Sequence, residues 1–158
     1  MQMRILKKLL GALGTLGIIG ILVVNLYPIC TGGKIYQIET GSMEPTIKTG
    51  SYVLIRPSEE LKTGQVVMFD QPGYPVPIVH RVVAVNAGGQ ALTTRGDANG
   101  ADDASIDRSQ VRGIVTDVFS QYGVYHRPYQ IGAGILSLCL VGLSLLKTSK
   151  KGSHIKDA

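Results

Sequence analysis

A long uncharged stretch near the N-terminus constrains this chain more than any other feature. Residues 9–33 are 25 consecutive positions without a charge, led by Leu, Ile and Val. About 20 such residues cross the ~30 Å hydrocarbon core of a bilayer. A cleaved signal peptide is the alternative, but the run is too long, and residues 23–28 contain no pair of small residues at cleavage spacing. The sequence therefore predicts a retained transmembrane anchor over 9–33.

A second, weaker apolar stretch covers residues 128–146, which are 19 uncharged positions. It is short and contains glycine, so a docked or interfacial helix is the alternative to a second crossing. Basic residues flank both stretches, with Arg4, Lys7 and Lys8 before the first and several lysines after Leu146. Basic flanks mark the cytoplasmic side. The predicted order is a cytoplasmic N-terminus (1–8), an anchor (9–33), an extracytoplasmic domain (34–127), a second helix (128–146) and a cytoplasmic tail (147–158).

The net charge of +5 arises from the two tails, because residues 34–127 carry nine basic and ten acidic side chains. A folded domain without a basic stripe is not a nucleic-acid-binding domain. The two cysteines, Cys30 and Cys139, lie in or beside the apolar stretches and can build neither a disulfide framework nor a metal site. The sequence predicts no metal and no cofactor.

Between the apolar stretches the pattern changes to short β-rich runs separated by turn residues. Six runs are predicted as strands, over residues 35–40, 51–56, 65–69, 77–85, 91–95 and 113–119. Residues 71–77 hold three prolines and are predicted as a loop, as are the polar residues 98–107. We expect a mainly β protein with a small antiparallel, barrel-like domain between two apolar helices. A β domain of this size is marginal alone, so support from the anchor or a partner is expected.

One serine stands out, in Thr40-Gly41-Ser42-Met43-Glu44-Pro45-Thr46. A serine in a glycine-proline turn is most often only a turn residue. However, Ser42 is the ninth residue after the predicted anchor, and nine residues reach about 30 Å at most. Ser42 is therefore expected to work close to a membrane surface.

His80 is the only histidine in the body of the β domain, within an otherwise apolar strand. A half-buried histidine on a sheet face is the plain interpretation. The functional one is a general base, because imidazole titrates near neutral pH and accepts a hydroxyl proton. Such a base needs an acceptor for its second ring nitrogen, and the candidates are Asp97, Asp102, Asp103 and Asp107. A serine, a histidine and an aspartate together indicate nucleophilic acyl transfer.

Three segments resemble the characteristic boxes of type I signal peptidases, in that family's order and spacing. They are residues 41–46 (GSMEPT), 77–82 (PIVHRV) and 96–103 (GDANGADD). The resemblance is to the branch with histidine in place of the catalytic lysine, found in archaea, in some Gram-positive bacteria and in the endoplasmic-reticulum enzyme. It covers residues 35–119 and the preceding anchor.

The resemblance implies that Ser42 is the nucleophile, His80 the general base and Asp103 the triad acid, with Asp97 in a supporting role. It also implies that Thr40, where relatives often have serine, contributes with the Ser42 backbone N–H to an oxyanion hole. Threonine instead of serine there, and Ala98 after Gly96-Asp97, are departures from the family pattern.

The activity implied is removal of signal peptides from secretory preproteins, cut after a small residue with another small residue two positions before it. Expected partners are preproteins, the lipid bilayer, and accessory subunits or translocation machinery. The expected location is the cell membrane, with the endoplasmic reticulum as alternative; the second apolar stretch favours a prokaryotic membrane. Two other readings are an inactive tethered domain that binds signal sequences or serves a peptidase complex, and a self-cleaving regulatory protease. The latter normally has a lysine base and works in the cytosol.

Overall fold

The structure is a computed structural model that describes residues 1–146. Contacts divide the chain into two compact units, one of residues 1–22 with the segment from 130 onward, the other of residues 23–129. The tail predicted to be cytoplasmic, 147–158, lies outside the described residues, as does His154 within it.

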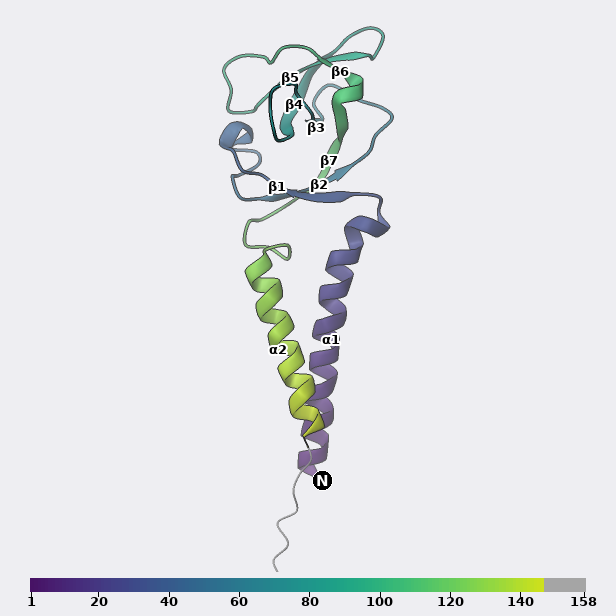
Figure 1. The fold of residues 1–158 in the computed structure, drawn as a ribbon, viewed down its shortest axis with the longest axis vertical. Coiled ribbons are helices and arrows are strands. Elements are labelled where there is room, and N and C mark those ends of the chain that lie inside the picture. The colour runs from purple at the N-terminus through teal and green to yellow at the C-terminus, as the bar shows by residue number, and fades with distance from the viewer. Residues whose placement is uncertain (147–158) are drawn as a thin grey trace, which may run out of the picture. The chain divides into compact units, whose positions relative to one another are not determined.

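Two apolar helices flank the β-rich part of the chain (Figure 1). Helix α1 covers Gln2–Cys30 and helix α2 covers Arg127–Leu145. Both are long and apolar enough to cross a membrane, with mean hydropathy of 2.3 and 1.5 over their most apolar windows. Helix α1 begins well before the expected residue 9, because the basic residues continue the helix without a cap or a breaker. It ends where Gly32 takes a left-handed φ of +68° and Gly33 donates to the Pro28 carbonyl.

In the first unit, small residues bring α1 and α2 into close contact. A Cβ added at Gly14 would lie 2.6 Å from the Ser137 carbonyl oxygen, and one added at Gly17 would overlap the Ser137 hydroxyl. Ser137 is correspondingly buried, at 6% exposure. Close backbone approach at small residues is the usual way apolar helices pack in lipid.

The second unit contains one seven-stranded antiparallel sheet of order β1-β2-β7-β3-β4-β5-β6. Its strands are β1 (Lys34–Gln37), β2 (Tyr52–Arg56), β3 (Val66–Phe69), β4 (Ile78–Val85), β5 (Ala91–Arg95), β6 (Ile106–Asp107) and β7 (Val111–Phe119). Register shifts interrupt the β2–β7, β3–β7 and β4–β5 pairs. Such bulges bend strands and increase twist, which curls the sheet. The expected mainly β, antiparallel domain is confirmed.

Both faces of the sheet are covered by apolar side chains, because neighbouring strand residues point to opposite faces. Met68 packs in one cluster while Val67 and Phe69 pack in the other. The first cluster comprises Ile38, Met43, Ile47, Val53, Ile55, Met68 and Val79. The second comprises Leu61, Val67, Phe69, Val82, Leu92 and Ile106. Met43 and Ile47 carry the segment around Ser42 into the first cluster.

The expected strands are present with shifts of up to three residues at their ends. The expectation of a loop throughout 98–107 was wrong at its end, where β6 pairs Ile106 with Leu92. Ile106 is buried in the second cluster, and Asp107 caps the short 3-10 helix η2 (Arg108–Gln110). The burial of Ile106 and the capping box of η2 stabilise this strand. With two residues it is too short to be predicted from a sequence pattern.

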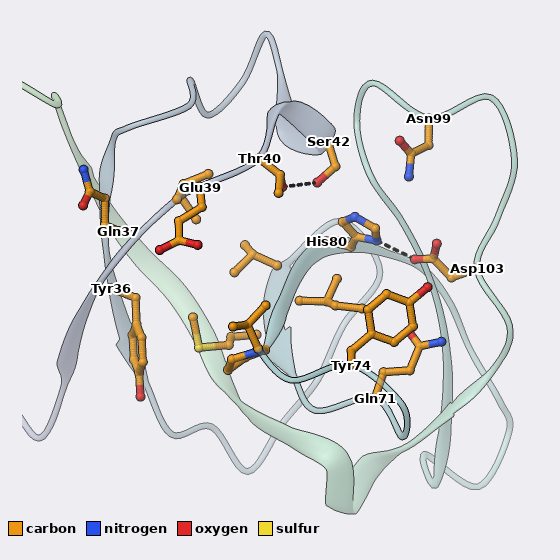
Figure 2. A pocket seen from close by; sticks show the side chains of 16 residues that line it. Tyr36, Gln37, Glu39, Thr40, Ser42, Gln71, Tyr74, His80, Asn99 and Asp103 are labelled. Carbon is orange, nitrogen blue, oxygen red and sulfur yellow. Dashed lines mark hydrogen bonds and ion pairs between the residues drawn. The ribbon is translucent and has the colours of Figure 1, made fainter.

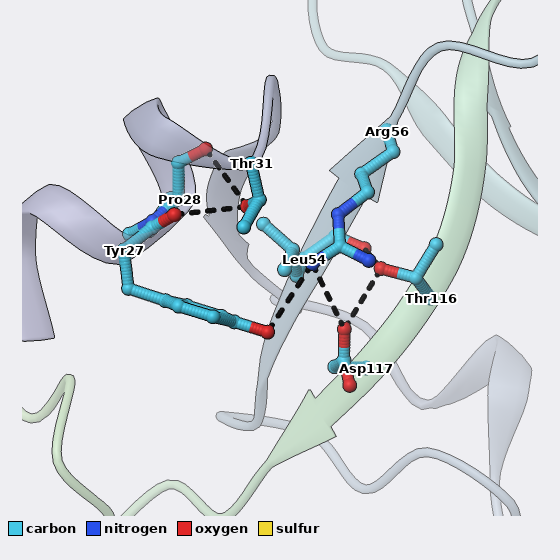
Figure 3. A network of polar contacts seen from close by, with 7 residues as sticks. All are labelled: Tyr27, Pro28, Thr31, Leu54, Arg56, Thr116 and Asp117. Carbon is cyan, nitrogen blue, oxygen red and sulfur yellow. Dashed lines mark hydrogen bonds and ion pairs between the residues drawn. The ribbon is translucent and has the colours of Figure 1, made fainter.

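The last turns of α1 belong to the same unit as the sheet and contact it through polar groups (Figure 3). Arg56 Nη2 on β2 donates to the Tyr27 hydroxyl at 3.2 Å and lies 3.8 Å from Asp117 on β7. The Thr31 hydroxyl donates to the Tyr27 carbonyl at 2.9 Å. An added Cβ at Gly33 would lie 2.6 Å from Leu54, so the chain enters β1 in close contact with β2. The contacts of Tyr27 with Arg56 and of Gly33 with Leu54 attach the end of α1 to the sheet.

Candidate active site

Ser42 lies in a single 3-10 turn, η1 (Gly41–Met43), rather than in an open turn. Met43, with 1% exposure, holds the turn against the first cluster. On the other side of the turn, the Glu44 carboxylate accepts from both the backbone N–H and the hydroxyl of Thr49, at 3.1 and 2.8 Å. These hydrogen bonds hold the pKa of Glu44 below its usual value. The bonds between Glu44 and Thr49 therefore join the two ends of the segment 44–49. Ser42, just before it, is partly exposed.

The backbone of Ser42 is fixed by the loop that follows β5. The N–H of Ala98 donates to the Ser42 carbonyl at 2.9 Å, and an added Cβ at Gly96 would lie 2.6 Å from the same oxygen. Glycine is required at 96 because the two backbones approach so closely. Two of the three predicted family boxes thus meet through backbone contacts.

His80 projects from β4 and is buried, with 7% exposure. Its Nδ1 lies 2.6 Å from Asp103 Oδ2, and since a carboxylate only accepts, Nδ1 carries the hydrogen (Figure 2). The ring meets Phe69 edge to face, with centroids 6.3 Å apart. The imidazole is therefore oriented by one carboxylate and one aromatic ring.

Thr94 holds the carboxylate that contacts His80. Its hydroxyl donates to Asp103 Oδ2 at 2.8 Å, and its carbonyl accepts from the Asp103 N–H at 2.8 Å. Thr94 lies on β5 with 0% exposure. A buried threonine thus fixes both the backbone and the side chain of Asp103.

Ser42 and His80 line the same cleft, and Figure 2 shows the Ser42 hydroxyl above the His80 ring, on the side of the ring away from Asp103. The Thr40 hydroxyl lies 3.4 Å from Ser42 Oγ. Within residues 1–146 Ser42 makes no hydrogen bond to His80. The two side chains come from different segments of the chain, η1 and β4, and both lie on the wall of this cleft.

The four candidate aspartates have four different partners. Asp103 contacts His80, whereas Asp97 pairs with Arg81. Asp102 pairs with Arg95 at 3.2 Å, and Asp107 accepts from Ser109 as the cap of η2. Only Asp103 among them contacts the imidazole within the described part of the chain.

Asp97 forms a bidentate ion pair with Arg81, the residue after His80. Arg81 Nε and Nη2 donate to its two carboxylate oxygens at 2.8 and 2.6 Å, and Arg81 Nη1 donates to the Gly64 carbonyl. These hydrogen bonds hold the pKa of Asp97 below its usual range, and the Thr46 hydroxyl lowers it further. Asp97 therefore connects β4, the loop after β5 and the segment that carries Ser42.

The cleft itself has a volume of about 590 Å³. Two extended segments, residues 36–40 and 76–80, line it together with Met68, Gln71 and Tyr74. Ser42, Asn99 and Asp103 line it as well. The cleft is a channel between two extended backbones with a hydroxyl, an imidazole and a carboxylate on its wall.

A family model described as signal peptidase, peptidase S26, matches residues 8–112. The chain belongs to the S26 signal peptidase family. The matched range includes all five predicted site residues: Thr40, Ser42, His80, Asp97 and Asp103.

The chain is also similar to signal peptidase complex catalytic subunits of fungi. It is 36% identical to that of Scheffersomyces stipitis and 37% identical to that of Lodderomyces elongisporus, each over 75 residues. It is 39% identical to that of Sclerotinia sclerotiorum over 77 residues. Each match covers 46% of this chain and 45% of the relative, so the chain spans about half the length of the relatives it matches.

Several residues that support the candidate site were not predicted from the sequence. Thr94 and Arg81 contact the two aspartates, and Gly96 and Glu44 fix the Ser42 segment. Arg81 and Gly96 stand next to predicted residues within the family boxes, so their position could have identified them as candidates. Thr94 lies outside the boxes, and nothing in its neighbourhood distinguishes it from other strand threonines.

Proposed function

We propose that this chain is a membrane-bound serine endopeptidase, a type I signal peptidase that removes signal peptides from secretory preproteins. One observation carries the proposal. Ser42, His80 and Asp103, from three separate segments, line one cleft, and the ring nitrogen of His80 nearer Asp103 is 2.6 Å from its carboxylate. Membership of the S26 family supports the same reaction.

The reaction begins when His80 Nε2 takes the proton of the Ser42 hydroxyl and Ser42 Oγ bonds to the scissile carbonyl carbon. The carbon–nitrogen bond then breaks, and the imidazolium gives its proton to the departing amine. A water molecule next attacks the ester while His80 takes one of its protons. The bond to Ser42 Oγ breaks, the signal peptide leaves as a carboxylic acid, and Ser42 recovers its proton from His80.

Asp103 is assigned the role of the triad acid. By accepting from Nδ1–H it leaves Nε2 without hydrogen, which is the tautomer able to accept the serine proton. Thr94 keeps the carboxylate in that position. Asp97 is assigned a supporting role through Arg81, since its own carboxylate is taken up by the guanidinium.

The Thr40 hydroxyl and the Ser42 backbone N–H are assigned to the developing oxyanion. Thr40 lies on the cleft wall with its hydroxyl 3.4 Å from Ser42 Oγ, which places it near an oxygen bound next to Ser42. One such donor contributes roughly 3 kcal/mol to transition-state stabilisation.

The substrate is expected to bind as an added strand. Strand β1 is an edge of the sheet, and residues 78–80 of β4 pair only with β3, so both segments facing the cleft have unpaired backbone groups. Main-chain hydrogen bonds would hold an extended peptide while alternate side chains enter pockets. Ile38, Met68 and Val79 offer an apolar pocket wall, suited to the small residues at and two positions before the cut.

Helices α1 and α2 are compatible with membrane association by length and composition. We assign the chain to the cell membrane, with the endoplasmic-reticulum membrane as alternative. An anchor close to Ser42 raises the effective concentration of membrane-bound preproteins. Because the similar fungal proteins are catalytic subunits of a complex, accessory subunits are proposed as further partners.

The proposal is tested with detergent-solubilised protein, a preprotein and mapping of the cut by mass spectrometry. Wild type should release the signal peptide after a small residue, whereas Ser42→Ala and His80→Ala should abolish processing and remain in the membrane fraction. Near-normal activity of either variant would remove the assignment. A serine-directed covalent probe separates the alternative of an inactive signal-sequence-binding domain, which would leave Ser42 unlabelled.

A further inference from the structure

An unpaired carboxylate lies on the wall of the cleft, three residues before Ser42. Glu39 is exposed and lines the cleft, and Figure 2 shows it between Gln37 and Thr40. In the described residues it makes neither an ion pair nor a hydrogen bond. By contrast Glu44, five residues on, is bonded twice to Thr49.

The charge of Glu39 is not balanced by its surroundings within the cleft. The described lining contains no lysine or arginine. Its other carboxylate, Asp103, already accepts from His80 and Thr94. Apolar groups such as Val76 and Pro77 make up much of the facing wall. An incoming peptide would therefore meet one available negative charge, which attracts a cation.

The alternation of the extended segment fixes which substrate residue meets this charge. Ile38 points into the core with 6% exposure, while Gln37 and Glu39 are exposed. In an added strand, side chains also alternate, and neighbours across strands share a face. The two small substrate residues, at the cut and two positions before it, would enter the apolar pocket beside Ile38. The substrate residue between them would then point to the opposite face, which is the face of Glu39.

We propose that Glu39 is a specificity residue that favours preproteins with lysine or arginine between the two small residues preceding the cut. This inference rests on the proposed function and adds a substrate class to it. The preference is modest because Glu39 is exposed, and we expect about a fivefold difference in kcat/KM between lysine and glutamine substrates. It should weaken at high salt, since screening acts on exposed charges.

The test uses three peptides that differ only at the middle position, with Lys, Gln or Glu. Wild type should cleave them in the order Lys, Gln, Glu. Glu39→Gln should cleave all three at similar rates, and Glu39→Lys should reverse the order. Glu59→Gln, an exposed carboxylate outside the cleft, is the matched control and should keep the wild-type order.

Equal cleavage of the three peptides by wild type, or an unchanged order in Glu39→Lys, would overturn the inference. Binding of the same peptides to Ser42→Ala, followed by fluorescence anisotropy, separates it from the proposed reaction. If Ser42→Ala binds the Lys peptide more tightly than the others but wild type cleaves none of them, the peptidase assignment is refuted and the charge preference of Glu39 is supported. If the three peptides bind Ser42→Ala equally well and wild type cleaves them normally, the peptidase assignment stands and the role of Glu39 is refuted.

Discussion

At the scale of single residues, two of the three aspartates in the GDANGADD segment, Asp97 and Asp103, have different partners. Asp103 and Asp97 are six positions apart, yet one contacts the imidazole and the other the guanidinium of the next residue in β4. The side chains of His80 and Arg81 point to opposite faces of the strand. The alternation of β4 therefore separates the carboxylate that contacts His80 from the carboxylate that pairs with Arg81.

We predict that Asp103→Asn lowers kcat much more than Asp97→Asn. An amide at 103 can donate to Nδ1 and so stabilise the wrong imidazole tautomer, which costs about 10⁴-fold in a Ser-His-Asp protease. Asp97→Asn leaves the contact between His80 and Asp103 intact and should cost about tenfold or less. Steady-state kinetics on one preprotein measures both. The opposite ranking would mean that Asp97 is the acid.

The Arg81–Asp97 pair should make stability depend on pH in the acid range. Since the pKa of Asp97 is lower in the folded protein than its usual value, the pair stabilises fully above about pH 4. That contribution is lost as the pH falls through the lowered pKa, because protonation removes the charge. Asp97→Asn should reduce stability by about 2 kcal/mol at pH 7 and flatten the loss below pH 4.

Denaturant unfolding at several pH values measures this effect. Asp102→Asn is the control, since its pair with Arg95 is half exposed and contributes little. An Asp97→Asn protein with the wild-type acid profile would contradict the assignment.

At the scale of elements, the loop after β5 and the turn η1 form one support for Ser42. Their contact is backbone to backbone, through the Ser42 carbonyl, Ala98 and Gly96. Backbone contacts of this kind tolerate no added atoms, whereas the nearby Gly100 has nothing within 4 Å of its missing Cβ. A substitution at Gly96 therefore tests this contact, and the same substitution at Gly100 is its control.

We predict that Gly96→Ala displaces η1 and lowers kcat at least tenfold, because the added methyl overlaps the Ser42 carbonyl. Gly100→Ala should keep wild-type activity. Circular dichroism should show the sheet retained in both variants, since neither glycine lies in a strand. Full activity of Gly96→Ala would show that the loop does not position Ser42.

At the scale of the whole molecule, one β-rich unit follows one apolar helix and precedes another. The basic residues in the first turns of α1 (Arg4, Lys7 and Lys8), and the lysines that follow Leu146 in the sequence, favour both ends inside and residues 34–127 outside. An outward sheet is required for the proposed function, because preproteins are processed after translocation.

We predict that a cysteine at Gly88, in the open hairpin between β4 and β5, is labelled by an impermeant maleimide on intact cells. Cys30 and Cys139 are replaced by serine for this experiment. A cysteine at Lys8 is the control and should react only after lysis. Labelling of position 8 but not position 88 on intact cells would reverse the topology.

From the sequence alone came the signal peptidase resemblance, which the family model confirms, and the prediction of the principal residues of the candidate site. Long uncharged runs predict helices because burying an unbonded backbone in lipid is so costly. Short alternating runs predict strands, and the three boxes point to Ser42 and His80 through their residue types and order. The short strand β6 and the exact ends of α1 could not be found this way, since tertiary contacts and the absence of a breaker decide them.

Which side chains contact one another follows from the packing of the folded chain. From the sequence, four aspartates were candidates for His80, and the resemblance alone favoured Asp103. Strand pairing and the fold of one loop bring Asp103 to His80 and Asp97 to Arg81. The same holds for Thr94 and Glu39, whose environments depend on segments distant in the chain. Residue types record what chemistry a chain can perform, whereas contacts between distant segments arise only when the backbone has packed.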